Sequence, residues 1–172
     1  MLGANLAAGN HDTASNPEHR SGLFPGLVWI ALIAGTLDIS ENLIFNVFRN
    51  VTPYMVFQYI ASGLIGMRSF SSGIVSVALG VTIHYAIAFA WTLIYFAASR
   101  KLSVLVRLPV ICGLLYGVLV YVVMTFAVLP LTSVPHSTKA MTLTARINAV
   151  AALMFCVGLT IALLVRRQTI AR

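Results

Sequence analysis

The chain has 172 residues, 59% of them hydrophobic and 9% charged, with a formal net charge of +7. Soluble domains carry roughly 25% charged residues and keep much of their surface in water, so this composition excludes a soluble fold. The basic residues stand at the ends of apolar runs, which is typical of anchoring at lipid headgroups. We therefore expect the lipid bilayer as the partner and no binding of nucleic acid.

The chain begins with a polar segment and continues with four long apolar runs. Residues 1–22 are small and polar, which predicts a disordered tail. In lipid, backbone groups must be hydrogen-bonded within their own segment, and roughly 20 helical residues cross the hydrocarbon core. The runs therefore predict an all-α membrane protein, a four-transmembrane-helix bundle within residues 23–167, followed by a short tail at 168–172. The predicted spans are residues 24–47, 74–97, 108–129 and 147–165.

A shorter apolar stretch, residues 53–65, follows the first span. Thr52 can act as its N-cap, Pro53 suits the first helical turn, and Gly66 suits the stop. A helix of this length rises only about 20 Å, which is too short to cross the hydrocarbon core. We therefore expect a short interfacial or re-entrant helix after the first span.

The positions of lysine and arginine predict how the bundle is oriented. With four spans, the N-terminal tail, the middle loop and the C-terminal tail share one side of the membrane. Basic residues accumulate on the cytoplasmic side of membrane proteins. The shared side holds more of them, so we expect a multi-pass protein of the cell inner (plasma) membrane with its N- and C-termini in the cytoplasm. The shared side has Arg20, Arg100, Lys101, Arg107, Arg166, Arg167 and Arg172, and the opposite side has Arg49, Arg68, Lys139 and Arg146.

Two acids, Asp38 and Glu41, interrupt the first span. A charged group at the centre of a bilayer costs roughly 2.5–3.5 kcal/mol even on the most lenient scale, so such residues call for a functional or structural reason. With Asn42, they lie at i, i+3 and i+4, on one face of a helix. The second span carries His84 at a similar depth, on a face with small residues. Both polar faces are therefore expected to point into the bundle.

Other polar residues can join this intramembrane cluster. Tyr121 falls at a similar level of the third span, and Arg146 and Asn148 begin the fourth. One interpretation is a proton relay through Asp38, Glu41 and His84. The other is structural, with an Asp38–His84 hydrogen bond and an ion pair from Glu41 to Arg146 or Arg68. We favour the structural interpretation, because four spans rarely form a transporter without repeats or oligomers.

No motif of a known catalytic or cofactor site is present. The sequence has no phosphate loop, no dinucleotide fingerprint and no hydrolase or zinc-protease signature. Asp38, Glu41 and His84 have the atom types of metal ligands but no recognised spacing, and a bis-histidine haem would need a second inward histidine. We therefore predict no catalytic residue, no cofactor and no metal.

The third span contains a GxxxG pattern, formed by Gly113 and Gly117. This spacing lets two helix backbones approach closely. Packing within the chain is the favoured interpretation, and a contact between two copies is the alternative.

Several motifs resemble those of a group of small, uncharacterised four-span bacterial inner-membrane proteins. They are the run 58–66 (QYIASGLIG), Leu79-Gly80 with His84, Tyr116-Gly117-Val118, and Pro130-Leu131. The resemblance covers roughly residues 25–165, and it extends more distantly to YagU-type membrane proteins. It implies a bacterial inner membrane and no particular activity.

These observations predict a non-enzymatic membrane protein, an accessory or stress-related subunit. The alternative is a small oligomeric proton-linked transporter or channel that uses Asp38, Glu41 and His84. Either function allows a homo-oligomer or another membrane protein as partner.

Overall fold

A computed structural model describes residues 23–134 and 142–170. Within these ranges the chain is helical and contains no strand, and four helices are long and apolar enough to cross a membrane. The predicted all-α, four-helix fold is therefore confirmed. The first span is α2 (Leu23–Val47) and the second span is α4 (Gly73–Lys101). The third span consists of α6 (Pro109–Val123), η2 (Met124–Val128) and α7 (Leu129–Leu131). The fourth span consists of α8 (Leu143–Ala152), η3 (Leu153–Leu159) and α9 (Thr160–Ile170).

The second and fourth helices extend beyond the apolar runs that predicted them. The second span continues to Lys101, so that Arg100 and Lys101 lie in its last turn, where basic side chains complement the helix dipole. The fourth begins at Leu143, because the Thr142 hydroxyl caps it by accepting a hydrogen bond from the Ala145 N–H at 3.3 Å. These two helix ends therefore lie at a cap and at basic residues rather than at the edge of the hydrophobic run.

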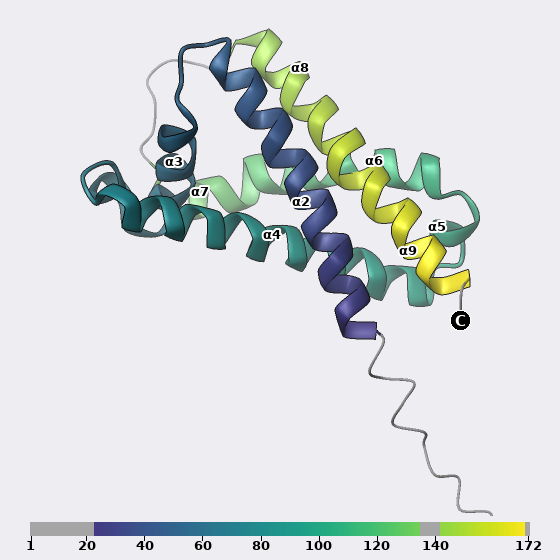
Figure 1. Ribbon diagram of the computed structural model, residues 1–172. Helices are drawn as coiled ribbons and strands as arrows, with labels where there is room; N and C mark the ends of the chain where they lie inside the picture. Colours follow the sequence, from purple (N-terminus) through teal and green to yellow (C-terminus); the bar gives the residue numbers. More distant parts are fainter. Residues whose placement is uncertain (1–22, 135–141, 171–172) are drawn as a thin grey trace, which may run out of the picture.

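The fourth span is the centre of the arrangement. Figure 1 shows it beside α2, and it packs against both α2 and α6, while α2 also packs against α4. An apolar core lies where the N-terminal half of α2 and the C-terminal half of the fourth span meet α4 and α6. The α2 residues of this core end at Ala34, before the two acids. Its buried members are Leu27, Ile30, Ala34, Tyr95, Tyr116, Val120, Val157, Ile161, Ala162 and Val165.

The predicted short helix is present as α3 (Pro53–Ile65), and it ends in a 3-10 turn, η1 (Gly66–Phe70). Thr52 caps α3 by accepting from the Met55 N–H at 3.3 Å, and Gly66 stops it with a positive φ of 61°. The helix packs against α4, and its Gly63 carbonyl accepts a hydrogen bond from the Ser133 N–H at 3.0 Å. It therefore links α4 to the end of the third span.

The third and fourth spans each contain a π-helical segment. In the third, the Leu129 N–H donates to the Met124 carbonyl, five residues back, and Pro130 follows. Proline has no N–H and crowds the preceding turn, so a local widening of the helix accommodates it. In the fourth, the π segment η3 lies against α6.

Glycines allow that contact between α6 and η3. Gly113 and Gly117 are buried, and a Cβ added at Gly113 would lie 2.8 Å from the Gly158 carbonyl oxygen. A Cβ at Gly117 would meet the backbone of Leu153 and Met154. The GxxxG pattern thus faces the fourth span of the same chain, so its glycines are covered and are not free to contact a second copy.

Candidate intramembrane polar site

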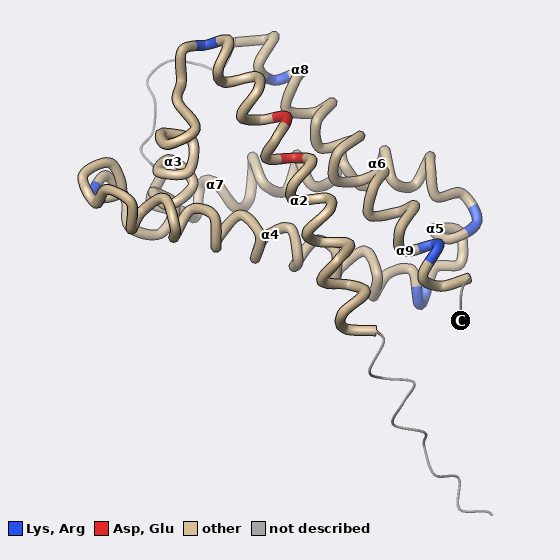
Figure 2. The backbone as a smooth tube through the Cα atoms, in the orientation of Figure 1, with Lys and Arg blue, Asp and Glu red and all other residues tan. Residues whose placement is uncertain are grey.

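The two acids lie on the later half of α2, one turn beyond its buried small residues. Ala31, Ala34 and Gly35 are buried against neighbouring helices, and helical spacing brings Asp38 and Glu41 to the side of that stripe. Both acids are half-buried, whereas Asn42 is exposed. Figure 2 shows the two acids one turn apart on α2. The small residues thus let neighbouring helices approach, and the acids then meet polar groups on those helices.

Glu41 joins the first span to the fourth. The Asn148 side chain donates a hydrogen bond from its Nδ2 to the Glu41 Oε1 at 2.8 Å, and both residues are partly buried. Glu41 takes this amide in place of the expected Arg146 or Arg68. Arg146 lies two residues earlier on α8 and is exposed, so helical geometry turns its side chain away from α2. An amide is the less expensive partner here, because it brings no second charge into the membrane.

His84 joins the second span to the first. Its Nε2 lies 2.9 Å from the Gly35 carbonyl oxygen. Because a carbonyl oxygen only accepts, Nε2 must carry a hydrogen, which is true of one neutral tautomer and of the imidazolium. Next to it, the Tyr85 hydroxyl and the Thr36 hydroxyl form a second bond between the same helices at 3.0 Å. Two neighbouring residues of α4 therefore hold two neighbouring residues of α2.

Asp38 lies between these contacts. It is within electrostatic range of His84 and of Glu41, and Cys156 on the fourth span is within range of both acids. Within the described ranges, 23–134 and 142–170, no residue forms a hydrogen bond or an ion pair with the Asp38 carboxylate. The Nε2 of His84 donates to the Gly35 carbonyl oxygen instead of to Asp38. The site therefore combines three interhelical hydrogen bonds with one acid that has no donor among the described residues.

Three of the predicted residues lie apart from these contacts. Asn42 accepts a bond from the Asn46 side chain at 3.0 Å on the exposed surface of α2. Tyr121 is half-buried on α6, and its hydroxyl forms no hydrogen bond with the described part of the chain. Arg146 borders an apolar hollow of about 350 Å³ on the fourth span. Of the residues predicted at the start of the fourth span, Asn148 contacts Glu41 and Arg146 does not.

Sequence reasoning missed a second group of buried polar residues, between α3 and α4. Gln58 donates to the Ser76 hydroxyl at 3.5 Å, and Ser76 donates to the Gly73 carbonyl at 2.8 Å. Ser62 and Ser69 are also completely buried, and the Ser69 oxygen has no partner within the described chain. The signal was available, since Gln58 and Ser62 stand at i and i+4, on one face of the short helix.

Metal ligation finds no support in the described ranges, because no group of three or more His, Cys, Asp or Glu side chains there could hold an ion. The chain matches no family model, no curated protein and no solved structure.

Proposed function

We propose that this chain is a non-enzymatic accessory subunit of a bacterial inner membrane, and that its intramembrane polar residues hold its helices together. The observation that carries this proposal is that α2 is bonded on both sides: Asn148 donates to Glu41, and His84 donates to the Gly35 carbonyl. Apolar side chains gain little free energy when they move from lipid into a helix contact, because lipid is also apolar. Close packing and hydrogen bonds between helices therefore stabilise the bundle. Both polar bonds serve that role without a substrate.

The charge distribution supports the proposed orientation, with both termini in the cytoplasm. Figure 2 shows basic residues at the end of the molecule where α4 and α9 finish and α6 begins. That end has Arg100, Lys101, Arg107, Arg166 and Arg167, against Arg49, Arg68 and Arg146 at the other. A reporter that is active only in the periplasm, fused after Arg172, should give no signal, whereas a fusion at Ser137 should give one. The reverse pattern would overturn the orientation.

A second function, proton-linked transport by an oligomer, is favoured by one observation. Asp38 lies within electrostatic range of His84, yet its carboxylate has no hydrogen bond from the described residues. An acid without fixed donors can gain and lose a proton without breaking a structural contact, and ionisable groups inside membranes often serve proton pathways. This makes Asp38 the residue on which the two functions differ.

Proton flux into liposomes separates the two functions. The purified protein is reconstituted, and flux is compared for the unchanged chain, Asp38→Asn and protein-free vesicles. Asparagine keeps the shape of aspartate but cannot titrate. The accessory function predicts equal flux in all three. A flux that the unchanged protein supports and Asp38→Asn abolishes, with the variant still folded, would replace the accessory function with the transport function.

A further inference from the structure

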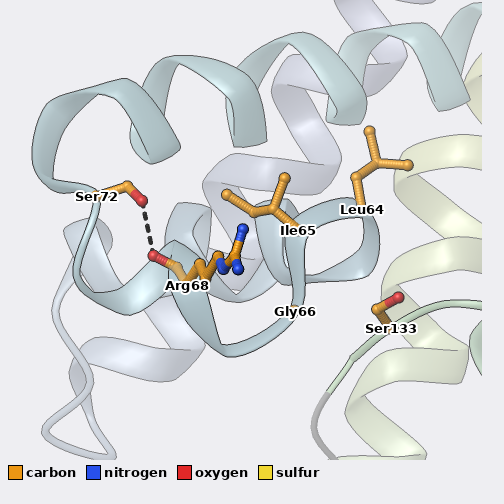
Figure 3. Close-up of a pocket in the computed structure, with 6 residues that line it drawn as sticks. All are labelled: Leu64, Ile65, Gly66, Arg68, Ser72 and Ser133. Atoms are coloured by element: carbon orange, nitrogen blue, oxygen red, sulfur yellow. Dashed lines mark hydrogen bonds between the residues drawn. The ribbon is translucent and has the colours of Figure 1, made fainter.

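One hollow lies away from the polar site, at the corner between α3, η1 and the residues after α7. Figure 3 shows its lining, and its volume is about 560 Å³. Hollows of roughly 300–1,000 Å³ are the size that small ligands occupy. Its lining residues are Leu64, Ile65, Gly66, Arg68, Ser72 and Ser133.

One part of this lining suits an anion. Arg68 is exposed, and the acids of the described chain, Asp38 and Glu41, both lie inside α2, so neither neutralises it there. The Ser72 hydroxyl donates to the Arg68 carbonyl at 2.7 Å and has therefore used its hydrogen. The Ser133 hydroxyl lines the same hollow and donates to none of the described residues. A guanidinium fork and a hydroxyl in the same hollow are a good match to phosphate oxygens.

The other part of the lining is apolar. Leu64 and Ile65 border the same hollow, and both are exposed, Leu64 by 66%. An inorganic anion would leave these side chains uncovered, whereas a ligand with both a phosphate and a hydrocarbon chain would cover them.

The position of the corner also indicates an amphiphilic ligand. It belongs to the end of the molecule where α2 finishes and α4 begins, and a four-span topology places that end at one membrane boundary. Phosphates of lipid headgroups lie at this level, next to the first methylene groups of the acyl chains.

We propose that this corner is a binding site for a phospholipid headgroup. The Arg68 guanidinium and the Ser133 hydroxyl bind the phosphate, and Leu64 and Ile65 contact the adjoining acyl chain. The site is independent of the proposed accessory function, since it shares no residue with the Asp38 cluster. It would place a specific lipid beside α3, the helix that links α4 to the end of the third span.

Native mass spectrometry of the detergent-purified protein, titrated with phosphatidylglycerol, tests the site. Arg68→Gln should weaken binding by about tenfold or more, because it removes a charge-assisted bond. Arg68→Lys keeps the charge but loses the fork, and should weaken binding by a smaller factor. Arg146→Gln is the matched control, since Arg146 is another exposed arginine of the same end but borders a hollow that is apolar apart from Arg146 itself. It should leave the binding unchanged.

Three results would overturn the proposal. Equal weakening by Arg68→Gln and Arg146→Gln would indicate attraction to net charge rather than a site. Unchanged binding in Arg68→Gln would remove the guanidinium from any role. In a parallel titration, inorganic phosphate that binds as tightly as the lipid, with the same dependence on Arg68, would identify a soluble phosphate as the ligand in place of the headgroup.

Discussion

The fourth span contacts its two neighbours in opposite ways. Against α6 it makes a close contact, in which Gly158 lies against the backbone of Gly113 and Gly117 and the only side chain close to Gly113 in the described chain is the methyl group of Ala162. Against the later half of α2 it makes a polar contact, in which the Asn148 amide donates to the Glu41 carboxylate. The first contact requires that the glycines have no side chain, and the second requires a hydrogen-bond donor and an acceptor.

This difference determines what each contact tolerates. An added methyl group at the glycine crossing has no space, because backbone atoms cannot rotate away as side chains can. At the polar contact, size matters less than hydrogen bonding, and measured bonds of this kind in membranes average only about 0.6 kcal/mol. Substitutions at the crossing should therefore cost more than substitutions in the polar site.

The largest effect is expected for Gly158→Ala. Its new Cβ would collide with the Gly113 carbonyl and lie 2.6 Å from the Gly117 nitrogen, so α6 and the fourth span must separate. Overpacking costs about 1–3 kcal/mol, partly offset by the helix propensity of alanine. We expect the unfolding free energy in detergent micelles to fall by about 2 kcal/mol.

Gly63→Ala is the matched control for that change. A Cβ at Gly63 would have its nearest neighbours at 3.8 Å, an ordinary van der Waals distance. The same substitution should therefore leave the unfolding free energy unchanged or raise it by up to about 1 kcal/mol. Equal effects at both glycines would contradict the close crossing.

His84→Ala should have an intermediate effect. It removes the bond to the Gly35 carbonyl, and interhelical bonds in membranes contribute up to about 1.7 kcal/mol. We expect a loss of about 1 kcal/mol in unfolding free energy. His84→Gln retains an N–H donor on a side chain of similar reach and should recover part of the loss. If glutamine is no better than alanine, packing rather than the hydrogen bond explains the effect.

The smallest effect is expected for Tyr85→Phe. This change removes only the hydroxyl that bonds to Thr36, at an exposed position of the α2–α4 contact. The loss should be about 0.5 kcal/mol, measured in the same unfolding assay. Thr36→Val should match it, and the double variant should lose no more than either one. Additive losses would show that the two hydroxyls act separately.

The fold was largely predictable from the sequence, because hydrophobic length and caps are local properties. Four apolar runs predicted the four helices, and Thr52, Pro53 and Gly66 predicted α3 with its bounds. The π segments were not predicted. The segment η2 accommodates Pro130. The segment η3 lies at the contact with α6, and that contact is not visible in the local sequence.

The polar site was predictable only in part. Helical spacing and depth selected Asp38, Glu41, His84 and Asn148, which do come from three helices that pack together. The individual partners were not predictable, because they depend on the rotation of each helix about its own axis. A polar side chain can also choose a backbone carbonyl, as His84 does with Gly35, and such acceptors occur at every residue.

The most direct test of the proposed cohesive role is a double-mutant cycle between Glu41 and Asn148. Unfolding free energies in detergent micelles are measured for the unchanged protein, Glu41→Leu, Asn148→Leu and the double variant. Asn148→Leu alone should be destabilising, because it leaves a half-buried carboxylate without its donor. We predict a favourable coupling energy of about 1 kcal/mol between the two side chains. A coupling energy of zero within error would contradict the account that this polar bond holds the first and fourth spans together.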